Sequence, residues 1–293
     1  FAAPMILPEN TLESARQWDA QDPLNAFRGQ FLLPKVEQQP IIYFPGNSLS
    51  LQPADTEAAI KRELEGWARF GVEGHFHARH PWFSYHERFA AGAGSLVGGR
   101  LEEVVLMNQL TTNLHFLLVS FYRPKGKRVK VLTEHRPFPS DTYALASQIA
   151  FHGLDPKECL VEMQPREGEH NLRTEDILAK VHELGDELAL VLFGGVNYFT
   201  GQAFHMEAIT AKAHEAGAVA GFDLAHAAGN IPLQLHDWNV DFACWCTYKY
   251  LNSGPGSVGG AFVHERHLKS DLPRLAGWWG HDKSTRFQMG REF

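Results

Sequence analysis

The chain has 293 residues, a hydrophobic content of 44% and a formal net charge of -7 at pH 7. This composition predicts a globular protein with a substantial core, and the acidic balance argues against nucleic acid as a partner. The longest apolar run, FLLVSFY at 116–122, falls short of the roughly 20 residues that cross a bilayer, so we expect no membrane partner. Three cysteines, and a FAAPMILPEN start that lacks a signal-peptide pattern, indicate a reducing, cytoplasmic setting.

The first part of the chain differs from the rest. Residues 1–50 are rich in proline and irregular, which predicts an N-terminal arm laid over a large domain at 51–293. From Asp55, a plausible helix cap, apolar residues recur every three or four positions, at Ile60, Leu64, Trp67 and Phe70. This spacing predicts a helix, and SYHERFAAGAGSLVG (84–98) predicts another.

Apolar runs and amphipathic stretches then alternate. Seven runs are predicted to be strands: 103–108, 128–134, 159–163, 188–195, 218–223, 242–247 and 259–265. Helices are predicted between most of them, at 111–122, 139–153, 173–185 and 206–217. Because the strands are continuously apolar, we expect an α/β fold with a mainly parallel seven-stranded sheet flanked by helices. Ligands of such folds bind at the carboxyl ends of the strands.

Two charged residues follow neighbouring predicted strands. Asp223 ends AVAGFD, and Lys249 stands in TYKYLN just after FACWC. Pyridoxal phosphate needs both types, because its aldehyde forms a Schiff base with a lysine and its pyridine nitrogen pairs with a carboxylate. A helix cap would explain Asp223 equally well, and a surface lysine remains an alternative for Lys249.

A phosphate seat and a stacking ring can be placed in the same crevice. Thr111 and Thr112 stand where a strand gives way to a long helix, and the N-terminus of a helix binds phosphate. Phe138, in RPFPSD, could stack on a cofactor ring. Ordinary capping and core packing explain these residues without a ligand.

Other motifs carry less weight. GPGSVG (254–259) matches a dinucleotide fingerprint, but it lies late in the predicted sheet and leads into a strand instead of a helix. HFHARH (75–80) and HERH (264–267) lack the spacing of zinc peptidases, so we expect no metal and interpret HERH as solvated surface. No Gly-x-Ser-x-Gly elbow of a hydrolase is present in the sequence.

The segment FDLAHAAGNIPLQLHDWNVDFACWCTYKYLNSGPGSVGGAFVHERH resembles the kynureninase family of fold type I pyridoxal phosphate enzymes. The similarity extends through YFPGNSLSLQP, VLMNQLTTNLHFLL, FPSDTYALASQ, QPREGE, TGQAF and GWWGHDKSTRF, from about residue 16 onward. The resemblance implies hydrolysis of L-kynurenine or 3-hydroxy-L-kynurenine to anthranilate or 3-hydroxyanthranilate plus L-alanine. This reaction belongs to tryptophan catabolism and NAD biosynthesis. The resemblance also implies a homodimer with its site at the subunit interface.

The resemblance assigns roles to residues of this sequence. Lys249 matches the Schiff-base lysine and Asp223 the partner of the pyridine nitrogen, with Tyr248 as a candidate for proton transfer. Other matches to cofactor positions are Leu110, Thr111, Phe138, Asp141, His226, Tyr248 and Trp278. Ser48 and His75 match positions that line the substrate pocket.

Two departures from the family pattern stand out. Gly194 occupies a position that is typically serine, and the chain stops at GREF, about where a C-terminal small domain with a substrate-binding arginine is expected. We therefore expect that small domain to be absent, which leaves a catalytically idle cofactor-binding fragment as one alternative. A lyase of the cysteine desulfurase type is another, although it would need a reactive cysteine on a loop.

Overall fold

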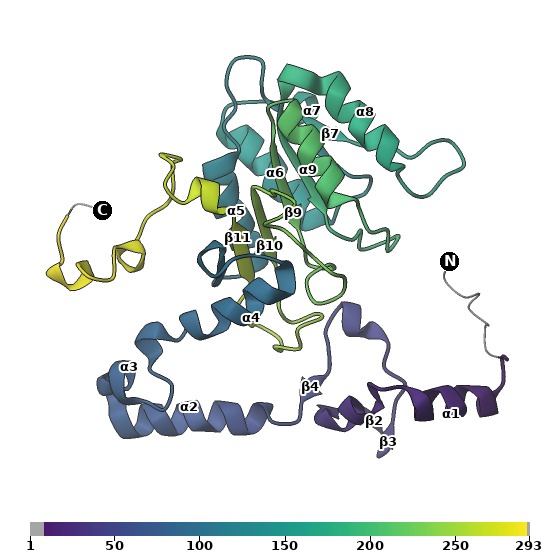
Figure 1. Cartoon of the computed structure of the whole chain (residues 1–293), viewed down its shortest axis with the longest axis vertical. Helices are drawn as coiled ribbons and strands as arrows, with labels where there is room; N and C mark the ends of the chain where they lie inside the picture. Colours follow the sequence, from purple (N-terminus) through teal and green to yellow (C-terminus); the bar gives the residue numbers. More distant parts are fainter. Residues whose placement is uncertain (1–8, 292–293) are drawn as a thin grey trace.

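A seven-stranded sheet lies at the centre of the molecule (Figure 1). The computed structural model describes residues 9–291, so most of FAAPMILPEN and the last two residues of GREF lie outside the described residues. The strands are β5 (Val104–Leu106), β6 (Lys130–Thr133), β7 (Leu160–Glu162), β8 (Leu188–Gly194), β9 (Val219–Asp223), β10 (Phe242–Trp245) and β11 (Gly260–Val263).

The strand order is β5-β11-β10-β9-β8-β6-β7. In this sheet β11 runs in the direction opposite to the other six strands, since it pairs antiparallel with both β10 and β5. The central strands are buried along nearly their whole length, as continuous apolar runs require. The predicted mainly parallel seven-stranded α/β fold is therefore confirmed.

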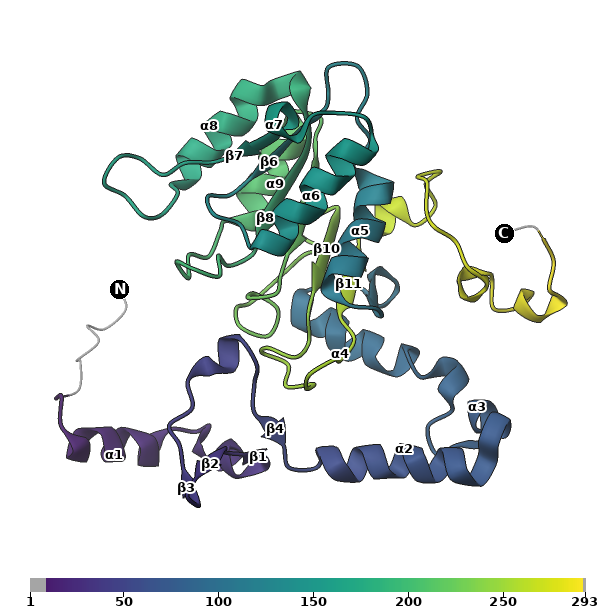
Figure 2. The ribbon, with the colours of Figure 1, turned by 180° about the vertical axis from the view of Figure 1, so that it is seen from behind.

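Helices cover both faces of the sheet (Figure 2). They are α4 (Glu87–Val97), α5 (Leu110–Phe121), α6 (Pro139–Phe151), α7 (Pro156–Cys159), α8 (Thr174–Leu184) and α9 (Met206–Glu215). One core cluster contains residues of α4, α8 and α9, such as Val97, Val181 and Ile209. The other contains residues of α5 and α6, such as Leu114 and Leu145. The four helices predicted between the strands are all present.

The chain before α4 forms an N-terminal extension, residues 9–86, much of which lies away from the sheet (Figures 1 and 2). It contains α1 (Leu12–Gln21), α2 (Thr56–Phe70), α3 (Gly74–His77) and the short strands β1 (Phe31–Leu32), β2 (Lys35–Val36), β3 (Gln39–Pro40) and β4 (Gln52–Pro53). The irregular structure predicted for residues 1–50 is wrong over α1, where the Thr11 side chain accepts a hydrogen bond from the Ser14 N–H and caps the helix.

Helix α2 is present as predicted, but its apolar face stays largely exposed to solvent. Ile60, Leu64 and Trp67 keep 57%, 56% and 66% of their surface exposed. Asp55 stands at the helix start without a side-chain capping hydrogen bond. Contiguous exposed apolar surface of this kind is typical of a surface that another protein covers.

Short 3-10 helices connect these elements. They span Asn25–Gln30, Pro45–Asn47, Gly71–Glu73, Trp82–Ser84, Leu101–Glu103, Gly185–Glu187, Glu265–His267, Trp278–Gly280 and Arg286–Gln288. Within residues 9–291, the structure contains no helix with the length and apolar character needed to cross a membrane.

Candidate active site

The carboxyl ends of three neighbouring strands converge on one cavity. Asp223, the last residue of β9, pairs in register with Gly194 of β8 and Cys244 of β10. A cavity of about 350 Å³, within the range of small-molecule sites, opens beside these strand ends. We call it the Lys249 pocket; it is lined by Asn47, Ser48, Leu110, Thr111, Glu134, Phe138, Ser140, Asp141, Gly194, Val196, Tyr198, Asp223, Ala225, His226, Tyr248 and Lys249.

Asp223 shares the buried side of the pocket with Asp141, which stands in the first turn of α6. Burial raises the pKa of Asp141 well above its usual range, and the charge of Asp223 and a hydrogen bond to it act in the same direction. Burial also raises the pKa of Asp223. Three effects act in the opposite direction: a hydrogen bond from the Ala225 N–H at 2.7 Å, a hydrogen bond from Asp141 and the charge of Lys249. Asp141 therefore holds its proton more tightly than Asp223 does, which favours the negative charge on Asp223.

Lys249 lies in the turn after β10 and reaches back into the pocket. Its amine donates a hydrogen bond to Nε2 of His226 at 2.9 Å and lies 5.7 Å from the centre of the Phe138 ring. Burial, and then the Lys249 charge, lowers the pKa of His226 to about 4. His226 is thus a neutral acceptor at neutral pH.

The N-terminus of α5 supplies an anion seat on the same pocket. Leu110 begins the helix, and Gln109 before it makes no side-chain capping hydrogen bond, which leaves the first N–H groups uncapped by that residue. The Thr111 hydroxyl lies 3.0 Å from the Ser140 hydroxyl, at the start of α6. Two hydroxyls and a helix N-terminus therefore face one point, which suits a phosphate.

Tyr248 and Ser48 join the pocket to the N-terminal extension. The backbone oxygen of Tyr248 accepts a hydrogen bond from the Ser50 N–H at 3.1 Å, and the Asn252 side-chain amide donates to the Leu51 oxygen at 3.0 Å. These bonds hold Ser48 against the cavity that Tyr248 lines. Burial, followed by Cys246, raises the pKa of Tyr248 to about 12, so its phenol stays neutral.

Two residues of the predicted site lie elsewhere in this chain. His75 packs edge-on to Trp82, with ring centres 5.6 Å apart, in a shallow depression formed by α2, α3 and Trp82. Trp278 is 46% exposed and donates its indole N–H to the Arg286 oxygen at 3.0 Å. Neither residue lines the Lys249 pocket of its own chain.

The prediction from sequence missed several pocket residues, above all Glu134 and Ser140. Glu134 directly follows β6, as Asp223 ends β9, so its place after an apolar run was a usable signal. Ser140 stands at the start of α6, next to Phe138 and Asp141. Gly194 was noted for its departure from serine, and it lies against Glu134.

The residues that line the Lys249 pocket match the chemical groups of pyridoxal phosphate. One oxygen of the Asp141 carboxyl is buried without a hydrogen-bond partner among the described residues, so it is available to bind a polar group of a ligand. The pocket also combines a buried carboxylate, a lysine amine, the partly exposed Phe138 ring and an anion seat. Each has a counterpart on the cofactor: its ring nitrogen, aldehyde, aromatic face and phosphate.

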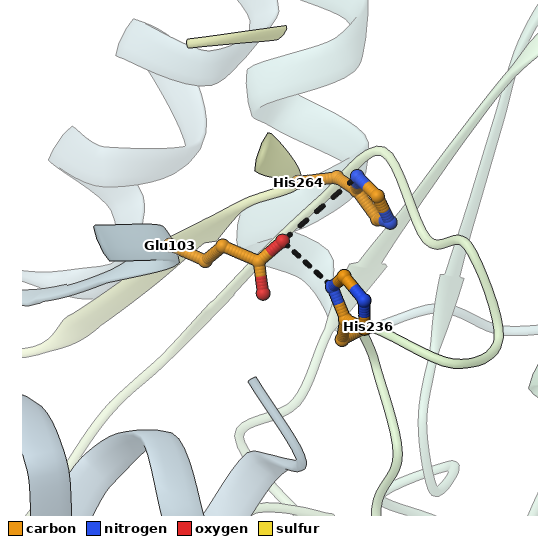
Figure 3. Close-up of side chains that lie close together, drawn as sticks. All are labelled: Glu103, His236 and His264. Atoms are coloured by element: carbon orange, nitrogen blue, oxygen red, sulfur yellow. Dashed lines mark hydrogen bonds and ion pairs between the residues drawn. The ribbon is translucent and has the colours of Figure 1, made fainter. Parts of the chain in front are cut away.

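A second cluster of ligand-type side chains lies apart from this pocket. Glu103, His236 and His264 are grouped together (Figure 3), with ligand atoms within 4.8 Å of one another. The Glu103 carboxylate already accepts hydrogen bonds from the Arg100 and Glu265 N–H groups, at 2.8 and 2.7 Å, and from His236 at 2.9 Å. Nδ1 of His264 accepts the Arg266 N–H at 3.2 Å. The cluster therefore acts as a hydrogen-bonded clip between segments.

The interpretation of HERH as solvated surface was wrong. His264 is 6% exposed because β11 carries it against Glu103 and the ring of His236, whose centre lies 4.8 Å away. His267 bonds to the buried carboxylate of Asp241 at 2.7 Å. Both histidines are held by acidic residues far away in the sequence, which the local spacing does not reveal.

Comparisons with known proteins place the chain among its relatives. The aminotransferase class-V family model matches residues 44–278. Solved structures with a similar fold include a cysteine desulfurase from Thermococcus onnurineus, 20% identical, with a TM-score of 0.61 over 81% of this chain and 57% of that one. A mutant C-DES with glycine linked to its PLP cofactor, 19% identical, gives a TM-score of 0.66 over 86% of this chain and 63% of that one. At these identities the likeness concerns the fold alone.

Curated relatives found by sequence have much higher identity to this chain. A kynureninase of Flavobacterium johnsoniae is 58% identical over 97% of this chain and 67% of its own length, and one of Myxococcus xanthus is 56% identical with the same coverage. The kynureninase of Nematostella vectensis is 51% identical over 96% of this chain and 63% of its own length. The chain thus spans about two thirds of the length of its curated relatives, and it belongs to the kynureninase family of class-V aminotransferase-like proteins.

Proposed function

We propose that the chain binds pyridoxal phosphate in the Lys249 pocket and hydrolyses L-kynurenine, or its 3-hydroxy derivative, to anthranilate or 3-hydroxyanthranilate plus L-alanine. One water is consumed for each carbon–carbon bond broken. The observation that carries the proposal is the convergence of Lys249 and Asp223 on one pocket beside the anion seat of α5. Membership of the kynureninase family supports the choice of substrate.

Each part of the pocket has a role in holding the cofactor. Leu110 and Thr111 would bind its phosphate, Phe138 would stack on its ring, and Asp141 and Asp223 would face the ring nitrogen. His226, Tyr248 and Lys249 would surround its aldehyde end. The bound cofactor supplies an electron-withdrawing ring that stabilises negative charge at the α-carbon of the substrate.

Lys249 is the proposed proton carrier. Its amine is held by the neutral His226 ring, which accepts a hydrogen bond and adds no positive charge. A free amine at this point can take a proton from one carbon atom and return it to another. Tyr248, whose phenol is neutral, is the candidate to donate a proton as the bond to the aromatic fragment breaks.

A homodimer would complete the site. His75 and Trp278 lie outside the pocket of their own chain, and the N-terminal extension exposes an apolar face on α2. Burial of Ile60, Leu64 and Trp67 against a second copy would stabilise a dimer by roughly 25 cal/mol per Å² of apolar surface removed from water. We infer that His75 reaches substrate, and Trp278 the phosphate, at this interface in the cytoplasm.

The proposal divides the chain into an arm at 1–50 and a cofactor-binding domain at 51–293. Desulfurase chemistry is disfavoured, because it needs an accessible thiolate. Cys159, Cys244 and Cys246 are all buried, and burial raises the pKa of each thiol.

The test is a turnover assay on the chain loaded with pyridoxal phosphate. We expect L-kynurenine to give anthranilate and alanine in equal amounts, and Lys249→Ala to give neither. If the cofactor binds and neither L-kynurenine nor 3-hydroxy-L-kynurenine is cleaved, the hydrolase proposal is wrong for this chain and the idle-fragment alternative holds. A matched assay on a version extended at its C-terminus shows whether further residues restore turnover.

A further inference from the structure

Glu134 is a buried carboxyl of the Lys249 pocket that the proposed chemistry does not use. It directly follows β6, is 3% exposed and lines the cavity together with Lys249. Both of its carboxyl oxygens lie 3.0 Å from the Gly194 nitrogen, and the Thr133 hydroxyl donates to one of them at 3.3 Å. Among residues 9–291, Glu134 forms no ion pair within 4.0 Å.

Gly194 provides the space in which this carboxyl lies. A Cβ atom at position 194 would meet Oε1 of Glu134 at 2.9 Å, closer than side chains normally pack. The φ angle of Gly194 is not in the left-handed region, so the backbone itself would accept a side chain. The backbone oxygen of Val196 would lie 3.3 Å from the same Cβ atom, so the glycine is explained by close contacts, of which Glu134 makes the shortest, instead of by backbone conformation.

The charges around Glu134 are unbalanced. Asp223 faces it from β9 and Asp141 from α6, while His226, Tyr248 and Lys249 face the same pocket from the turns after β9 and β10. His226 and Tyr248 are neutral at pH 7, which leaves one lysine against three buried carboxyls. Burial, opposed by the Gly194 N–H and aided by the Asp223 charge, raises the pKa of Glu134 to about 7. Like charges that share one buried pocket disfavour ionisation of all three acids together.

We propose that Glu134 is a positioning residue that fills the space at Gly194 and, while it keeps its proton, leaves the negative charge of the pocket on Asp223. This inference rests on the proposed function, because Asp223 is the residue assigned to the ring nitrogen of pyridoxal phosphate. Ionisation of Glu134 would place a second negative charge beside it. The protonated acid still accepts hydrogen bonds from the Gly194 N–H and the Thr133 hydroxyl, and it does not compete for the Lys249 cation.

The direction of a pH effect on stability tests this role. A carboxyl whose pKa is raised on folding binds its proton more tightly in the folded state. The contribution of Glu134 to wild-type stability therefore falls as pH rises from the ordinary value of 4.5 to about 7, and Glu134 has no further effect above that. Glu134→Gln cannot ionise, and neither can Glu134→Ala, so both variants escape this loss.

We would measure Tm from pH 5 to about 9 for the full chain, with and without saturating pyridoxal phosphate. The Tm of Glu134→Gln minus that of wild type should increase up to about pH 7 and then level off. Glu134→Ala should show the same slope with a lower baseline, and Glu102→Gln, at an exposed position, should show none. A difference that is constant, or that decreases with pH, would overturn the proposal because a charged Glu134 behaves in that way.

The packing half of the proposal has its own test. Gly194→Ala should lower Tm in the wild-type background and lower it less in the Glu134→Ala background, since the methyl group then has room. Equal losses in both backgrounds would show that Glu134 does not set the size of residue 194. The Tm increase that pyridoxal phosphate causes in wild type tests the proposed function separately, so the two failures are distinguishable.

Discussion

The amine of Lys249 lies 2.9 Å from Nε2 of His226, on the wall of the pocket where β9 and β10 end. Because the lowered pKa of His226, about 4, keeps its ring neutral, the pair is a lysine donor and an imidazole acceptor. Nδ1 of the same ring lies 3.4 Å from the Tyr250 hydroxyl. The amine is thereby oriented before any ligand enters.

His226→Ala should reduce kcat about tenfold while Lys249 still binds the cofactor, since one net hydrogen bond is worth roughly 1 kcal/mol. Tyr250→Phe removes only the longer contact and should change kcat by less than about threefold. Steady-state kinetics on both variants, with bound cofactor measured by absorbance, checks this. Equal losses in the two variants would contradict the assignment of His226 as the direct partner.

Asp223→Asn should reduce kcat by roughly 100-fold or more, because a buried charge that stabilises the reacting centre is replaced by a neutral amide. Asp241→Asn is the matched control. Asp241 is also a buried aspartate, but it bonds to His214 and His267 at 2.8 and 2.7 Å, far from the pocket chemistry. It should lower stability and leave the kcat of folded protein unchanged, so a loss of kcat in both variants would argue against a specific role for Asp223.

The Glu103 clip predicts a stability effect with a defined pH dependence. Burial opposes its charge, but hydrogen bonds from the Arg100 N–H, His236 and the Glu265 N–H outweigh burial and lower the pKa of Glu103. Its contribution is therefore present above the ordinary pKa of 4.5 and is lost as pH falls below it. Glu103→Gln should cost about 1–3 kcal/mol of unfolding free energy near neutral pH.

Urea denaturation at pH 7 and at about pH 4 measures this difference. The neighbouring Glu102, which is exposed, provides the control: Glu102→Gln should stay within about 0.5 kcal/mol of wild type at both pH values. A Glu103→Gln defect that grew on acidification would show that the clip does not hold a charged carboxylate.

The exposed face of α2 predicts a change in assembly instead of in fold. Replacing Ile60, Leu64 and Trp67 together by serine removes apolar surface that is 56–66% exposed in the isolated chain. We expect the unfolding of the monomer to change little and the proposed dimer to dissociate. Sedimentation velocity measures the mass. Retention of the dimer by the triple variant would place the interface elsewhere, and the triple substitution of Glu57, Lys61 and Glu65 by serine on α2 serves as control.

Much of the pocket was predictable because its residues follow apolar runs. In a parallel sheet the ends of such runs meet at one edge, so Asp223, Lys249 and Thr111 could be placed together from sequence alone. The structure brings these three, with Phe138, Asp141 and Ser48, to one cavity. The sheet and its covering helices were predictable for the same reason.

The remainder depends on contacts between distant segments. His264 looks like surface until β11 carries it to Glu103, and Glu134 looks like a loop acid until β8 places Gly194 beside it. The helix α1 has no buried residue, so its apolar pattern is weak. His75 and Trp278 lie outside the Lys249 pocket of their own chain, and periodicity does not encode which surface each of them joins.

The most direct test of the central claim is the absorbance spectrum of the chain with pyridoxal phosphate before and after borohydride, compared between wild type and Lys249→Ala. Wild type should show a yellow bound cofactor that borohydride fixes covalently to the protein. Lys249→Ala should show neither the visible band nor the covalent label, because no amine remains at this point of the pocket. An unchanged band and label in Lys249→Ala would contradict the assignment of Lys249 as the residue that holds the cofactor.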